Sequence, residues 1–147
     1  MSVDEIQKLR EKTGLGVMEC KKALEEARGN FEQAKLVLKE KGAEKAVSKQ
    51  DRETENGIIE SYSHNGKIGV MLEILCETDF VVKNKEFKEL THDLVLQIAS
   101  MAPENEKELL AEPFIKDESK TVSDLLTEKI AKIGENIKIK RFERWEL

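Results

Sequence analysis

The chain has 147 residues, about the length of one ordinary domain. Charged residues make up 37%, well above the roughly 25% of an average soluble domain, and the formal net charge is −5. A net acidic chain is a poor general nucleic-acid binder, because such binders usually carry a net basic face. No apolar run approaches the roughly 18 residues of a membrane helix, and the start MSVDEIQKLR resembles neither a secretory nor a transit segment. We therefore expect a cytoplasmic protein that binds neither membrane nor nucleic acid directly.

Residues 1–42 predict a domain of three short helices. Apolar residues recur at helical spacing over residues 3–9, 17–27 and 31–38. Asn30 is predicted to cap the third helix, and Gly42 is predicted to end it. The polar, charged stretch that follows, residues 43–56, is interpreted as a helical extension that becomes a linker.

Residues 57–147 predict a second domain, which begins with a hairpin. Residues 58–64 and 68–75 flank Asn65-Gly66, the usual composition of a tight two-residue turn. In the second arm apolar residues alternate, which predicts one buried face. These residues are Ile68, Val70, Leu72, Ile74 and Cys76.

Helices and a closing strand are predicted after the hairpin. A long helix ends before Pro103, residues 103–120 are predicted as a loop, and a further helix spans residues 122–133. In the final strand the simple alternation puts Ile137, Ile139 and Trp145 on one side and Phe142 on the other. The predicted fold class is α+β, with helices on a small antiparallel sheet made of the hairpin and the C-terminal strand.

Catalytic chemistry is not apparent in the sequence. His64 falls at the predicted hairpin tip, and His92 lies on a predicted helix with surface-type spacing. Cys20 and Cys76 lie 56 residues apart, form no metal or redox pattern, and fall on predicted core positions. The Gly14-Leu15-Gly16 run follows a helix and lacks the third glycine of a dinucleotide loop. We expect no enzymatic activity, no cofactor and no metal site.

The segment Glu77–Val82 stands out because it lies between a buried strand and a long helix. One interpretation is a helix start, with Thr78 or Asp79 as the cap and Phe80 as a hydrophobic staple. The other is a protruding wedge, in which the ring of Phe80 fills a pocket of a partner, as aromatic anchors do at interface centres. The residues alone leave both interpretations open.

Three separated motifs resemble the bacterial translation elongation factor Ts family. They are Leu9–Gly14 with Met18–Leu24, Cys76–Val81 with Asn84 and Phe87, and Ile133–Ile137 with Arg141-Phe142. The resemblance implies a guanine-nucleotide exchange factor for elongation factor Tu, which binds its GDP-bound and nucleotide-free forms. It also implies that the N-terminal three-helix domain is similar to ubiquitin-associated domains.

The resemblance also implies which residues contact Tu. Thr78, Asp79, Phe80 and Val81 would enter between two helices of the GTPase domain, displace its Mg²⁺ and loosen GDP. The helical domain would dock through an apolar surface. Its residues would be Leu9, Val17 and Met18, with Arg10 and Lys21 as polar neighbours.

The chain is short for this family, and residues 103–113 bridge a portion that is longer in other members. It is most similar to short forms that assemble in pairs, so a homodimer is possible. The closing segment 141–145 has no cysteine, so a disulfide through this strand is not available. A dimer through an unpaired strand edge with Trp145 stays open.

Two other functions are alternatives. A ubiquitin-associated-type module could bind peptides through Val17 and Met18, with the α+β part as a scaffold. Basic residues of the last strand could instead bind RNA, although the net charge favours a solvated strand face. These residues are Lys138, Lys140, Arg141 and Arg144.

Overall fold

A computed structural model describes residues 2–147, and its N-terminal part consists of helices α1 (Val3–Thr13), α2 (Val17–Glu26) and α3 (Phe31–Lys49). The three predicted helices and the cap at Asn30 are confirmed, because the Asn30 side chain accepts from the backbone nitrogen of Gln33. Gly14 ends α1 in the left-handed conformation. The three helices enclose a small core of their own. Its buried residues are Leu9, Cys20, Ala23, Leu24, Ala27, Ala34 and Leu38.

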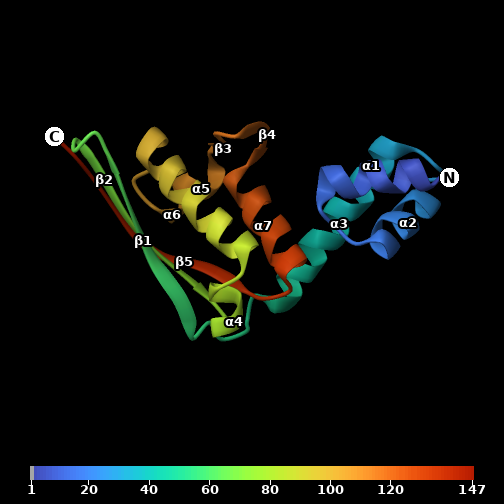
Figure 1. Cartoon of the computed structure of the whole chain (residues 1–147), viewed down its shortest axis with the longest axis horizontal. Coiled ribbons are helices and arrows are strands. Elements are labelled where there is room, and N and C mark those ends of the chain that lie inside the picture. Colours follow the sequence, from blue (N-terminus) through green and yellow to red (C-terminus); the bar gives the residue numbers. More distant parts are fainter. Residues whose placement is uncertain (1) are drawn as a thin grey trace.

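The prediction that the third helix ends at Gly42 is wrong, because α3 continues to Lys49. A glycine inside a helix costs up to about 1 kcal/mol relative to alanine, and here the packing of α3 against the second part of the molecule offsets that cost. A Cβ built on Gly42 would lie 3.6 Å from the Cβ of Ala131 in helix α7 (Val122–Ile133). The helix therefore runs from the N-terminal unit directly onto the second part of the molecule (Figure 1).

The second part is built on an antiparallel sheet of strands β1 (Asn56–His64), β2 (Ile68–Cys76) and β5 (Ile137–Glu146), in the order β1-β2-β5. The loop between β1 and β2 holds residues 65–67, one residue more than the predicted two-residue turn. Asn65 and Gly66 both have positive φ angles, which the Asn-Gly dipeptide adopts readily and which reverse the chain direction.

The predicted facing of the last strand is wrong at its C-terminal end. The pairing of β2 with β5 shifts between Glu73 and Ile74, so that Lys140 becomes an extra residue in β5. Such a bulge reverses the alternation beyond it. Phe142 therefore pairs with the buried Leu72 and packs on the core, while Trp145 turns to the outer face.

Helices lie along one side of the sheet, and the other side is open (Figure 1). They are α4 (Asp79–Val82), α5 (Lys85–Met101), α6 (Glu106–Ala111) and α7. The larger core lies between the sheet and these helices. Its fully buried large side chains include Leu72, Ile74, Phe87, Leu90, Leu94, Ile98 and Leu109.

Residues 103–120 are more ordered than the predicted loop. They contain α6 and a small antiparallel pair, β3 (Pro113–Phe114) and β4 (Asp117–Thr121). The buried Gln97 fixes this segment, because its amide donates to the carbonyl of Pro113 at 3.0 Å and accepts from the backbone nitrogen of Ile115 at 2.9 Å. Within residues 2–147 no helix is long and apolar enough to cross a membrane.

Candidate functional site

The segment after β2 forms an exposed corner, which we call the Thr78–Val82 corner. Thr78 is the N-cap of α4, and its hydroxyl accepts a hydrogen bond from the backbone nitrogen of Val81 at 3.3 Å. Val81 is buried in the main core, whereas the side chain of Phe80 is 78% exposed. The predicted cap at Thr78 is confirmed, and Phe80 projects into solvent instead of covering the helix start. The corner thus presents an aromatic ring on a short capped helix.

The helical unit presents a second apolar surface at the start of α2. Val17 is 47% exposed and Met18 is 61% exposed. Arg10 and Lys21 are exposed as well, and Nε of Arg10 donates to the carbonyl of Leu15 at 3.4 Å. The expected surface residue Leu9 is different: it is fully buried in the core of the helical unit. Its apolar character reflects packing, so Leu9 cannot itself meet a partner in this conformation.

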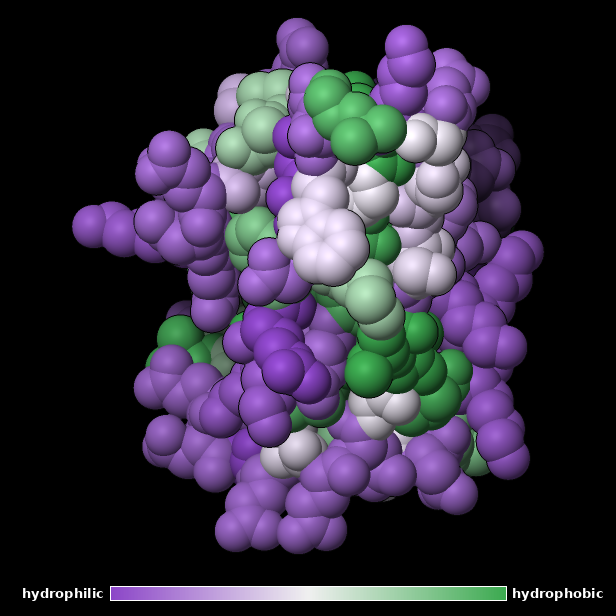
Figure 2. Space-filling view, turned by 90° about the vertical axis from the view of Figure 1, so that its left-hand side faces the viewer, coloured by the Kyte–Doolittle hydropathy of each residue, from purple (hydrophilic) through white to green (hydrophobic). Residues whose placement is uncertain are grey.

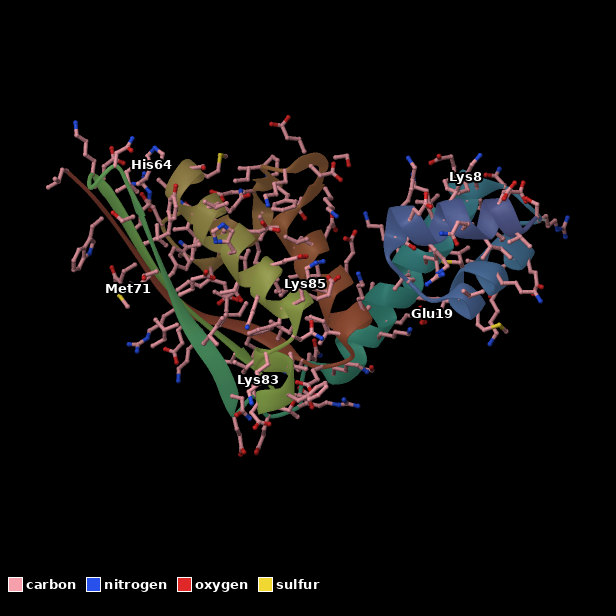
Figure 3. All side chains as sticks on the ribbon, viewed as in Figure 1. Lys8, Glu19, His64, Met71, Lys83 and Lys85 are labelled. Atoms are coloured by element: carbon pink, nitrogen blue, oxygen red, sulfur yellow. The ribbon has the colours of Figure 1, made fainter. Side chains whose placement is uncertain are left out.

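The outer face of the sheet carries a third exposed apolar group, made of Ile59, Met71 and Trp145. Figure 2 shows this side of the molecule, with pale and green atoms in a band bordered by hydrophilic side chains. Met71 points away from the helices that cover the inner face (Figure 3). Trp145 pairs with Gly69 near the start of β2, whereas the Thr78–Val82 corner follows the other end of that strand; Ile59 pairs with Glu73 between them.

The thiols and histidines do not form a reactive centre. Both cysteines are buried; burial raises the pKa of Cys76 to about 11 and also raises the pKa of Cys20. His64 lies near the hairpin tip, with Nδ1 2.9 Å from the hydroxyl of Tyr62, and His92 lies 3.6 Å from a carboxylate oxygen of Glu60. Among residues 2–147 no group of three His, Cys, Asp or Glu side chains could hold a metal ion.

The motif Ile133–Ile137 has no role predicted from the sequence. In the structure its Glu135 side chain lies against the Thr78–Val82 corner and hydrogen-bonds to it, 57 residues away in sequence. The signal available in the sequence was the co-occurrence of this motif with Cys76–Val81, which does not by itself reveal a contact.

Known proteins resemble this chain over most of its length. The family model described as "Elongation factor TS" matches residues 77–147. The elongation factor Ts of Coprothermobacter proteolyticus is 42% identical over an alignment that covers 100% of this chain and 98% of that protein. The chain belongs to the elongation factor Ts family. The factors of Thermodesulfovibrio yellowstonii and Thermotoga maritima are also 42% identical, covering 97% and 100% of this chain and 94% and 96% of theirs.

The alignments also show that this member is short. The alignment with the Coprothermobacter factor has 193 positions for the 147 residues of this chain, so 46 positions have no counterpart here. The family membership makes the protein a translation elongation factor.

Proposed function

We propose that the protein is a guanine-nucleotide exchange factor for elongation factor Tu, which binds Tu with GDP and without nucleotide and speeds the release of GDP. The observation that carries the proposal is the 78% exposed Phe80 on a capped helix in a member of the elongation factor Ts family. An exposed ring fixed on an ordered corner is suited to fill a pocket of a partner at little cost in conformational freedom.

The corner would act on the Mg²⁺ and phosphate site of Tu. Phe80 supplies the inserted ring and Asp79 an adjacent exposed carboxylate, while Thr78 and Val81 hold the short helix from its cap and from the core. A magnesium ion is among the largest local charges at a phosphate site, so displacing it weakens nucleotide binding efficiently. The factor makes and breaks no covalent bond in this scheme.

The thermodynamic basis is reciprocal coupling. A factor that stabilises the nucleotide-free state of Tu lowers the affinity of Tu for GDP, and GDP lowers the affinity of Tu for the factor by the same ratio. The exchange factor itself therefore needs no cofactor and no metal ion.

The helical unit would supply the second contact with Tu, through Val17 and Met18 with Arg10 and Lys21 at the border. Leu9 supports this surface from within the helical core and takes no direct part. In this proposal the helical unit contributes most of the affinity for Tu, and the Thr78–Val82 corner causes most of the increase in GDP release. We also propose the division of the chain into a domain of residues 1–42, a connecting segment 43–56 and a domain of residues 57–147.

The test is the release of a fluorescent GDP from Tu. Substoichiometric protein should speed release and should not hydrolyse GTP alone. Phe80→Ala should slow release by about tenfold or more, since an anchor commonly contributes about 2 kcal/mol. Met101→Ala is the matched control, because Met101 is also an exposed apolar residue, 46% exposed at the C-terminal end of α5. If the wild-type protein does not change the rate of GDP release from active Tu, the exchange function is rejected and the peptide-binding module is left as the alternative.

A homodimer is a separate part of the proposal. Ile59, Met71 and Trp145 give the outer face of the sheet an apolar patch that a second copy of the chain would cover, and β5 is an edge strand. Because Cys20 and Cys76 are both buried, the dimer should withstand reductant. A Kd on the order of 10 µM corresponds to a binding free energy of about 7 kcal/mol. Sedimentation that shows only a monomer at that concentration would reject the dimer.

A further inference from the structure

The loop between α7 and β5 holds the base of the Thr78–Val82 corner. One carboxylate oxygen of Glu135, Oε1, accepts hydrogen bonds from the backbone nitrogens of Glu77 and Thr78, each at 3.0 Å. The other oxygen, Oε2, accepts from the hydroxyl of Thr78 at 2.7 Å. A single side chain thus satisfies three donors at the point where β2 turns into α4.

The bond to the hydroxyl also fixes the cap of α4. A threonine hydroxyl has one proton and two lone pairs. Because Thr78 gives its proton to Glu135, its lone pairs face the backbone nitrogen of Val81, which donates to it at 3.3 Å. A four-residue helix is far too short to be stable by itself. Its orientation therefore depends on this cap and on the buried side chain of Val81.

The same loop ties the corner to the end of the helical unit. The backbone nitrogen of Asn136 donates to Oε2 of Glu77 at 2.7 Å. The buried Asn136 amide donates to the carbonyl of Arg52 at 2.8 Å and to that of Gln50 at 3.4 Å. These carbonyls belong to the turn that follows α3. Figure 1 shows the three segments meeting beside α4.

We propose that Glu135 is a positioning residue for Phe80, and that it holds the ring in the direction needed to enter Tu. The inference rests on the proposed exchange function and adds a residue to it. Glu135 acts through Thr78 and the α4 cap, because its two oxygens are already occupied by the corner. Holding the exposed ring in its inserted orientation lowers the ordering cost of the insertion step, which follows docking of the helical unit and therefore affects the release rate more than the affinity.

The test compares Glu135→Ala with Thr121→Ala. Thr121 is the N-cap of α7 and accepts from the backbone nitrogen of Asp124 at 3.1 Å, so its loss removes an ordinary cap away from the corner. Release of fluorescent GDP is measured against factor concentration, at a temperature where both variants are folded. Glu135→Ala should lower the maximal release rate about tenfold and change the half-saturating concentration less than about twofold, whereas Thr121→Ala should change neither.

Two further measurements separate positioning from a general loss of stability. Hydrogen exchange at the Val81 amide should speed up in Glu135→Ala and stay slow in Thr121→Ala. The double variant Phe80→Ala/Glu135→Ala should release GDP at the rate of Phe80→Ala alone, since Glu135 acts only through the ring. Glu135→Gln keeps an acceptor for the backbone nitrogens, so its maximal rate of GDP release should lie between those of wild type and Glu135→Ala. This variant is the test variant if Glu135→Ala does not fold.

The outcomes distinguish this inference from the function on which it rests. Normal release by Phe80→Ala would reject the wedge and the proposed function together. Slow release by Phe80→Ala beside normal release by Glu135→Ala would reject the positioning role alone. If the fold-losses in GDP release rate of the two single variants multiply in the double variant, the positioning role is also overturned, because Glu135 then acts independently of the ring.

Discussion

Replacing Glu86 by glutamine should destabilise the protein near neutral pH and leave it unchanged in strong acid. Glu86 lies in the first turn of α5 and accepts from Nζ of Lys129 at 2.6 Å and from Nζ of Lys132 at 2.8 Å. These two hydrogen bonds from α7 lower the pKa of Glu86 from 4.5 to about 2. The carboxylate therefore joins the start of α5 to the C-terminal half of α7.

The magnitude follows from that pKa. A fall from 4.5 to about 2 corresponds to at most about 3 kcal/mol of stability at pH 7. The side chain of Glu86 is 30% exposed, so solvent screening reduces this to about 1–2 kcal/mol. Since the folded-state pKa is the lower one, the stabilisation is complete above pH 4.5. It is lost as the pH falls from 4.5 toward 2, where the folded protein also takes up the proton.

Urea unfolding of wild type and Glu86→Gln between pH 7 and pH 2 measures this difference. Circular dichroism is the better probe, because the only tryptophan, Trp145, is 76% exposed in the single chain and its fluorescence would also respond to dissociation of the proposed dimer. Glu32→Gln is the matched control: Glu32 pairs with Lys35, but its side chain is 79% exposed. Parallel stability curves for wild type and Glu86→Gln across the whole pH range would refute the reasoning, whereas Glu32→Gln should follow wild type throughout.

Two paired substitutions test the packing around the site by urea unfolding. Val81→Ala should cost about 2 kcal/mol, because Val81 is buried, and Phe80→Ala less than about 0.5 kcal/mol, because its ring is exposed; the opposite order would mean that the ring is a core residue. Gly57→Ala should cost more than about 2 kcal/mol, since its Cβ would lie 2.3 Å from the carbonyl oxygen of Ile74. Gly69→Ala meets no heavy atom within 4 Å among the described residues and should be neutral or slightly stabilising; equal losses at both glycines would contradict this.

The sequence predicted the elements whose signals are local. The alternation in β2 and the left-handed glycines at the ends of α1 and α7 depend on neighbours within a few residues. The hairpin was predicted for the same reason, although its loop is one residue longer. These features follow from backbone preference and from the period of apolar residues, so a single sequence contains them.

The predictions that are wrong concern residues whose structure is determined by contacts with residues distant in the sequence. Gly42 normally suggests a helix end, but packing against Ala131 in α7 keeps it inside α3. The bulge at Lys140 depends on pairing with β2, and it exchanges the faces of Phe142 and Trp145. In both places the sequence alone contains the residues but not the neighbour that determines their structure.

The candidate site was located only in part. Thr78, Phe80 and Val81 form one corner as expected, and the structure gives each a different environment: cap, solvent and core. The buried Leu9 was expected at the surface from the family resemblance, although it continues the apolar stripe of Val3 and Ile6. The exposed Met18 lies outside the apolar stripe of α2, because Lys21 and Lys22 follow it at helical spacing. Glu135 was not predicted, since its contact with Thr78 spans 57 residues.

The connection between the two proposed contact surfaces follows from the parts that were not predicted. Val17 and Met18 lie on the surface of the helices that enclose one hydrophobic core, whereas Phe80 lies on α4, which Val81 anchors in the other core. Two contacts on one partner give a large gain only when their separation matches the partner, because a loose connection lowers the effective concentration of the second contact. Here α3 continues past Gly42 onto α7, and Asn136 then fixes the turn after α3 beside the corner. Although the chain has 46 fewer positions than its alignment with the Coprothermobacter factor, hydrogen bonds thus connect the turn after α3 to the Thr78–Val82 corner, so the two proposed contact surfaces are held at a defined separation.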